Sequence, residues 1–157
     1  MKNLKSKLKM EKILLSSILF LSMPAMAYTP KLLLVDQSYG FKQFLDENSI
    51  KRIDKSLMSV VVYEKYTYKN SDEYAKNYQS SIKKYIVDCP YKSLAMGSAN
   101  YYSGLTSNSE FVGAYNNILG HNGDTGEAFY FYDDLTYTSI KNSAADQKIY
   151  KRVCIGK

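Results

Sequence analysis

The sequence predicts an exported, β-rich domain that ends in a helix and is held by one disulfide bond. Residues 82–87 and 94–97, on the two sides of Cys89, are rich in β-branched, aromatic or alternating apolar residues, as paired strands are. Residues 139–153 carry apolar residues at helical spacing. The chain has two cysteines, Cys89 at the join of the strand pair and Cys154 at the end of the helix, so a bond between them would connect the two elements.

The first 27 residues have the features of a secretory signal peptide. Five lysines precede an apolar run, residues 13–23, which is too short to span a bilayer. Ala25 and Ala27 then place small residues at positions −3 and −1 of a cleavage site, so we expect the mature chain to begin at Tyr28. An uncleaved anchor is the alternative, and the cleavage site argues against it. We expect no transmembrane span after signal removal, and a single domain over residues 28–157.

Removal of the signal peptide changes the charge of the protein. The whole chain has a net charge of +6 and a pI of about 9.1. Residues 1–27 hold five Lys and one Glu, so the mature chain keeps 16 basic and 14 acidic residues, a net charge of +2. A nucleic-acid-binding domain is expected to have a pI above about 9 by itself. We therefore expect no nucleic-acid partner.

Export would place both cysteines in an oxidising compartment, where two cysteines in one domain are most simply a disulfide. Two free redox-active thiols are the alternative, but the chain has no C-x-x-C spacing. Closing a loop of about 65 residues should stabilise the fold by about 4 kcal/mol. That is comparable to the whole net stability of a small domain.

Periodicity and turn residues predict the other elements. The clearest strand covers residues 57–68, where apolar residues occupy both faces early and polar residues enter later, as in a central strand that ends in solvent. Residues 73–81 fit either helix or strand. The remaining predictions are strands at 31–35 and 128–132, turns at 37–40, 46–49, 54–56 and 69–72, a polar loop at 103–108, a loosely helical segment at 110–119 and a Gly-rich loop at 120–126.

The C-terminal helix has the strongest helical pattern. Ala145, Ile149 and Val153 follow one another at intervals of four residues and form one apolar stripe. Ser143 and Asp146 approximate a capping box at its start.

No catalytic or metal-binding constellation is predicted. His121 lies in the Gly-rich loop without an assignable carboxylate or nucleophile, so a solvated loop residue is a better interpretation than a general base. Asn122, Asp124 and Glu127 resemble part of a calcium loop, but the required spacing is absent. We expect no cofactor, no bound metal and no enzymatic activity.

Basic and aromatic side chains near Cys89 form the best candidate binding site. They are Lys83, Lys84, Tyr85, Tyr91 and Lys92. Together, such side chains suit an acidic polysaccharide or an acidic protein segment. The simpler interpretation, which we favour, is a strand whose lysines point to water and protect a sheet edge.

Five short motifs follow one another along the chain. Residues 41–46 precede Ser49-Ile50, a hydrophobic strand covers 58–66, a basic and aromatic run ends in Asp88-Cys89, a strand ends in Tyr101-Tyr102, and the terminal helix ends in Val153-Cys154. In this order and with this spacing of the two cysteines, residues 41–154 resemble the surface-adhesin protein E family of Gram-negative bacteria.

The resemblance implies an α+β fold in which an antiparallel β-sheet packs against the C-terminal helix, with an intrachain disulfide. It also implies a non-enzymatic binding protein for host extracellular-matrix or serum proteins, and a homodimer. Two features depart from the family. The named adhesin is lipid-anchored, whereas no cysteine stands at the cleavage site here, and the basic patch before Cys89 is thin.

The sequence leaves the location of the exported protein open. It could stay in the periplasm, or it could reach the cell surface or the medium. The alternative to an adhesin is a soluble periplasmic structural or interaction protein that shares only the fold of the family.

Overall fold

The computed structural model describes residues 28–156, except residues 122, 126 and 127. The predicted signal peptide, residues 1–27, lies outside the described residues, so cleavage between Ala27 and Tyr28 stays a prediction. Within the described part of the chain, no helix is long and apolar enough to cross a membrane.

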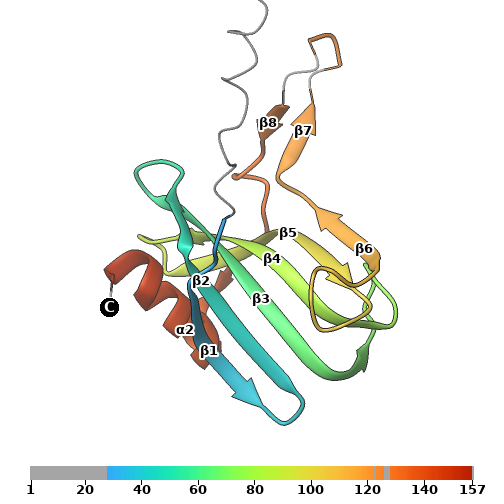
Figure 1. The fold of residues 1–157 in the computed structure, drawn as a ribbon. Helices are drawn as coiled ribbons and strands as arrows, with labels where there is room; N and C mark the ends of the chain where they lie inside the picture. Colours follow the sequence, from blue (N-terminus) through green and yellow to red (C-terminus); the bar gives the residue numbers. More distant parts are fainter. Residues whose placement is uncertain (1–27, 122, 126–127, 157) are drawn as a thin grey trace, which may run out of the picture.

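Six strands form an antiparallel meander in which sequence neighbours are also neighbours in the sheet (Figure 1). They are β1 (Leu32–Ser38), β2 (Phe41–Arg52), β3 (Leu57–Asn70), β4 (Tyr78–Asp88), β5 (Ser93–Tyr102) and β6 (Phe111–Asn116). The short strand β9 (Thr138–Ser139) pairs with β5. A separate hairpin of β7 (Leu119–His121) and β8 (Ala128–Tyr130) projects from the sheet. The predicted antiparallel sheet is confirmed.

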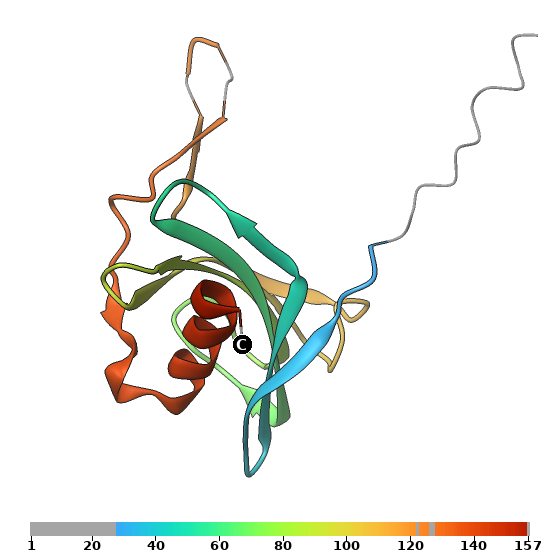
Figure 2. The same ribbon diagram turned by 90° about the vertical axis from the view of Figure 1, so that its left-hand side faces the viewer.

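The C-terminal helix packs against one face of the sheet, which curves around it (Figure 2). Helix α2 (Ala144–Tyr150) follows a 3₁₀ turn (Ile140–Asn142) and continues into a π turn (Lys151–Ile155). The predicted cap is present, because the Ser143 hydroxyl accepts a hydrogen bond of 3.1 Å from the backbone N–H of Asp146. The α+β architecture is therefore confirmed, although the helix proper begins later than residue 139.

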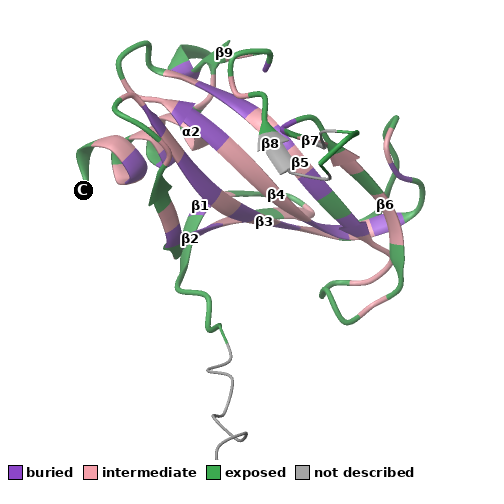
Figure 3. Ribbon diagram, turned by 90° about the horizontal axis from the view of Figure 1, so that it is seen from above, coloured by how far each residue is buried: buried purple, intermediate pink, exposed green. Residues whose placement is uncertain are grey.

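Alternation along β3 divides the sheet into two faces. The inner face, which holds Val60 and Val62, packs against the helix, and the outer face, which holds Val61 and Tyr63, lies opposite. Buried and partly exposed residues alternate along the strands (Figure 3). Ile149 of the helix is fully buried, as the predicted stripe requires. The inner core consists of Val35, Leu45, Val60, Val62, Val87, Leu94, Ile140, Ile149 and Val153.

Two smaller apolar clusters extend the core. Beyond the helix, the inner face carries Ala75, Tyr78, Ala99 and Tyr101. On the outer face, the segments around Ile118 and Leu135 cover one end of the sheet. That cluster consists of Leu57, Ile86, Ala95, Ile118 and Leu135.

Two predictions about the strands of the main sheet were wrong. Residues 46–49 are not a turn but part of β2, where the register with β3 shifts between Asp46 and Lys51. The segment 110–119 is not helical, because its apolar residues belong to the edge strand β6 and to the chain that leaves it. Of the two alternatives for residues 73–81, the strand is present from Tyr78 onward, where β4 begins, and no helix forms in this segment.

Candidate binding surface

The predicted disulfide between Cys89 and Cys154 is present. The two sulfur atoms are 1.99 Å apart and the two Cα atoms 5.7 Å apart. The hydroxyl of Tyr150 also donates a hydrogen bond of 3.2 Å to the backbone carbonyl of Cys89. The disulfide bond therefore fixes the C-terminal end of the helix to the turn between β4 and β5.

Lys83 of the predicted binding cluster lies on the inner face, paired with a carboxylate. Its Nζ atom is 2.7 Å from Oε2 of Glu64, and the two side chains are 15% and 5% exposed. Glu64 also accepts hydrogen bonds from Gln43, Tyr66 and Ser81 at 2.9–3.1 Å. Lys83 is therefore part of a buried polar cluster around Glu64 and does not face solvent.

Lys84 and Tyr85 point to opposite faces, as successive strand residues must. Tyr85 packs against the inner core, and burial raises the pKa of its hydroxyl. The Nζ atom of Lys84 lies on the outer side, 5.7 Å from the centre of the Tyr130 ring in the β7–β8 hairpin. Burial, followed by the nearby charge of Lys51, lowers the pKa of Lys84.

Tyr91 and Lys92 lie in the turn after Cys89. Tyr91 is 82% exposed, and Lys92 has a positive φ of 51°. Lys92 lines a groove against the helix together with Tyr150 and Ile155. The five predicted residues thus occupy three separate places, and the structure does not bring them together into one surface. Ligand binding by any of these five residues stays a prediction.

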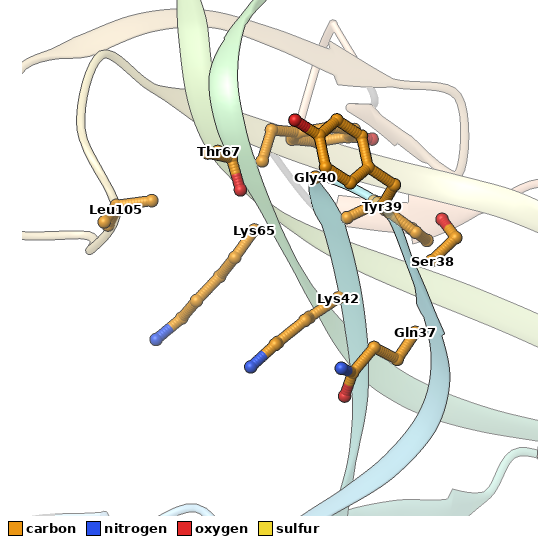
Figure 4. A pocket seen from close by; sticks show the side chains of 10 residues that line it. Gln37, Ser38, Tyr39, Gly40, Lys42, Lys65, Thr67 and Leu105 are labelled. Atoms are coloured by element: carbon orange, nitrogen blue, oxygen red, sulfur yellow. The ribbon is translucent and has the colours of Figure 1, made fainter.

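A groove on the outer face, at the tip of the first hairpin, gathers basic and aromatic side chains. It has a volume of about 800 Å³, and no acidic residue lines it. Lys42 of β2 and Lys65 of β3 are direct cross-strand partners, and both side chains extend away from the strands in the same direction (Figure 4). Neither lysine forms an ion pair within the described residues.

The most exposed aromatic residue that lines this groove is a tyrosine in the hairpin turn. Tyr39, in the turn between β1 and β2, is 92% exposed, and its hydroxyl is 3.4 Å from that of Tyr68. Gly40 follows with a φ of +76°, a left-handed conformation that a glycine adopts without strain. The turn therefore holds a large aromatic ring out in solvent, as many binding surfaces do.

Apolar side chains continue from the groove across the outer face. Leu34 on the edge strand and Leu105 in the polar loop are 45% and 50% exposed, and Phe111 on β6 is 57% exposed. The alternation along β3 could have shown that Lys65 lies on the outer side. The sequence could not show that Lys42 lies beside it, because this depends on the register of β2 and β3.

The histidine and the acidic loop residues give no catalytic site. The backbone of His121 pairs with that of Ala128 in the β7–β8 hairpin, so His121 belongs to a strand and not to the predicted loop. Asn122 and Glu127 lie outside the described residues. The described part of the chain contains no group of three or more His, Cys, Asp or Glu residues that could hold a metal ion.

Comparison with known proteins places the chain in a family. The sequence profile of the family described as Surface-adhesin protein E matches residues 32–155, well over half of the chain. No curated protein and no solved structure matches it. The profile match covers the whole antiparallel sheet, the helix and both cysteines, and it confirms the resemblance seen in the sequence. The chain therefore belongs to the surface-adhesin protein E family.

Proposed function

We propose that the protein is an exported, non-enzymatic adhesin that binds host extracellular-matrix or serum proteins through the outer face of its sheet. Membership of the family suggests a surface adhesin. The disulfide between Cys89 and Cys154 supports export, because disulfides form and persist in oxidising compartments.

The groove on the outer face is the reason for assigning ligand binding to that face of the sheet. The helix covers the inner face, while the groove leaves Tyr39, Lys42 and Lys65 accessible. Exposed tyrosines supply large contact areas, and unpaired lysines attract acidic partners and speed their association. A protein ligand with an acidic patch fits this surface, where two lysines lie side by side, better than it fits the turn at Tyr91, which has the single cation of Lys92.

Binding to immobilised host proteins tests this proposal. The mature chain, residues 28–157, is measured by biolayer interferometry against a panel of extracellular-matrix and serum proteins. The double variant Lys42→Glu/Lys65→Glu should bind at least about tenfold more weakly than the wild type, because it reverses both charges in the groove.

A charge-matched control separates the groove from overall charge. Lys55→Glu/Lys76→Glu makes the same change at two exposed positions outside the groove, and it should bind within about twofold of the wild type. Equal losses in the two double variants would contradict the role of the groove. Failure of the wild type to bind any host protein would favour the periplasmic interaction protein instead.

A further inference from the structure

A second, smaller pocket on the outer face brings two lysines together without a carboxylate. It has a volume of about 220 Å³ and shares no lining residue with the groove at the hairpin tip. Lys51 and Lys84 line it, together with the side chains of Tyr28, Ser49 and Ser59. The pocket lies near the base of the β7–β8 hairpin, whose Tyr130 ring contacts the Lys84 ammonium.

Strand register explains why these residues meet. The shift inside β2 places Lys51 directly opposite Ser59 of β3. On the other side of β3, Lys84 lies opposite Val61, two residues further along the same face. Direct and diagonal cross-strand neighbours on one face are close enough for long side chains to meet. Lys51, Ser59 and Lys84 therefore form a triangle around the pocket.

Neither of the two lysines forms an ion pair within the described residues. The buried carboxylate of Asp46 lies on the same face but accepts its hydrogen bonds from the Tyr28 hydroxyl and from backbone N–H groups, and it pairs with neither lysine. The nearby charge of Lys51 adds to burial in lowering the pKa of Lys84. A partly buried ammonium beside a second ammonium is unfavourable unless an anion lies between them.

A hydroxyl group in the pocket also lacks a partner. Ser59 is only 6% exposed, and its side chain makes no hydrogen bond to the part of the chain that the structure describes. The neighbouring Ser49 hydroxyl is different, because it donates to the carbonyl of Asp46 and accepts from the N–H of Val61, both at 2.7 Å. Ser59 is thus available to donate to a ligand.

We propose that this pocket binds a single sulfate or phosphate group, either as the free ion or as an ester on a larger molecule. Two ammonium groups and the Ser59 hydroxyl would donate to its oxygens, and charge-assisted hydrogen bonds of this kind are stronger than neutral ones. The volume of about 220 Å³ admits one such group with a few waters. The site does not depend on the proposed adhesin activity, because it concerns a pocket distinct from the groove.

Isothermal titration of the mature chain with sodium sulfate and sodium phosphate, at constant ionic strength set with sodium chloride, tests the site. The wild type should bind at least one of the two oxyanions at a single site. Lys51→Met and Lys84→Met should each weaken binding by about tenfold or more, and Ser59→Ala by about threefold or more. Lys55→Met and Lys76→Met remove the same charge at exposed positions outside both the groove and the pocket, and they should bind within about twofold of the wild type.

Thermal unfolding gives an independent measurement that does not require a ligand. Without sulfate or phosphate, Lys84→Met should unfold at the same temperature as the wild type or above it, because it removes an unpaired, partly buried cation. Added oxyanion should raise the midpoint of the wild type more than that of the variant. Equal binding by all variants, or no saturable binding of either ion, would overturn the proposal.

A sulfated monosaccharide and its unsulfated parent identify the source of the group. Binding of the sulfated sugar at the same site and more tightly than inorganic sulfate would support an ester ligand. Weaker binding of the sulfated sugar would support the free ion at the same site.

Discussion

The ammonium of Lys83 lies 2.7 Å from the carboxylate of Glu64, on the inner face between the core under the helix and the tyrosine cluster around Tyr101. Removing one partner of a buried ion pair leaves the other charge without compensation. Lys83→Met should therefore lower the free energy of unfolding by about 3 kcal/mol in urea denaturation at pH 7. The double variant Lys83→Met/Glu64→Gln should recover part of that loss. If Lys83→Met alone is as stable as the wild type, the ammonium of Lys83 is solvated and the ion pair is not buried.

The disulfide should contribute a large share of the stability. Cys89 and Cys154 are separated by 65 residues in the sequence, and a closed loop of this size is expected to stabilise by about 4 kcal/mol through the unfolded state. Cys89→Ser/Cys154→Ser, measured by urea denaturation beside the oxidised wild type, should lose about that amount. A loss below about 1 kcal/mol would mean that the helix holds its place without the bond.

Asp72 should make the stability depend on pH in the acid range. Burial alone would raise its pKa, but hydrogen bonds from the backbone N–H groups of Tyr74 and Ala75 and from the Tyr78 hydroxyl outweigh burial and lower it. A lowered folded-state pKa stabilises the fold above the unfolded pKa, and this contribution is lost as the pH falls through the folded pKa. It is therefore present at pH 7 and disappears below about pH 4.

The variant Asp72→Asn isolates this carboxylate. It should be about 1 kcal/mol less stable than the wild type at pH 7, and the difference should shrink as the pH falls from 4 to 2.5. If the difference in stability between wild type and variant stays constant across this range, the negative charge of Asp72 does not stabilise the segment that follows it. Denaturation curves at five or six pH values supply the measurement.

The edge strand β1 is the surface through which we expect a second copy to pair. Leu32, Leu33 and Leu34 are 46%, 40% and 45% exposed, and an exposed apolar edge strand invites pairing with another chain. If the predicted homodimer forms there, Leu32→Lys/Leu34→Lys should be a monomer in size-exclusion chromatography with light scattering. Leu119→Lys/Ile155→Lys changes two other exposed apolar residues and should stay dimeric. Loss of the dimer in both variants would place the contact elsewhere.

Local signals predicted much of this fold. Turn residues and side-chain periodicity set the two strands on either side of Cys89, and the Ser143 cap sets the start of the helix. Each of these signals lies within a few residues of the element that it predicts. The cysteine pairing followed from having two cysteines in a chain for which the sequence predicts a signal peptide.

The wrong predictions involve side chains whose partners lie far along the sequence. Asp46 looked like a turn residue, but its carboxylate accepts hydrogen bonds from the backbone N–H of Lys31 and from the hydroxyl of Tyr28, so it belongs inside a strand. Lys83 looked solvated because Glu64 lies on the neighbouring strand. The position of Glu64 on the same face as Val60 and Val62 was the available sign of a buried carboxylate that needs a cation.

The location of the mature chain tests the central claim most directly, because an adhesin must be reachable from outside the cell. Intact cells of the native bacterium are treated with protease and probed for the mature chain, with a periplasmic protein as the internal control. We predict that the chain is lost while the control survives. Survival of both would place the protein in the periplasm, where host ligands do not reach, and would contradict the adhesin function.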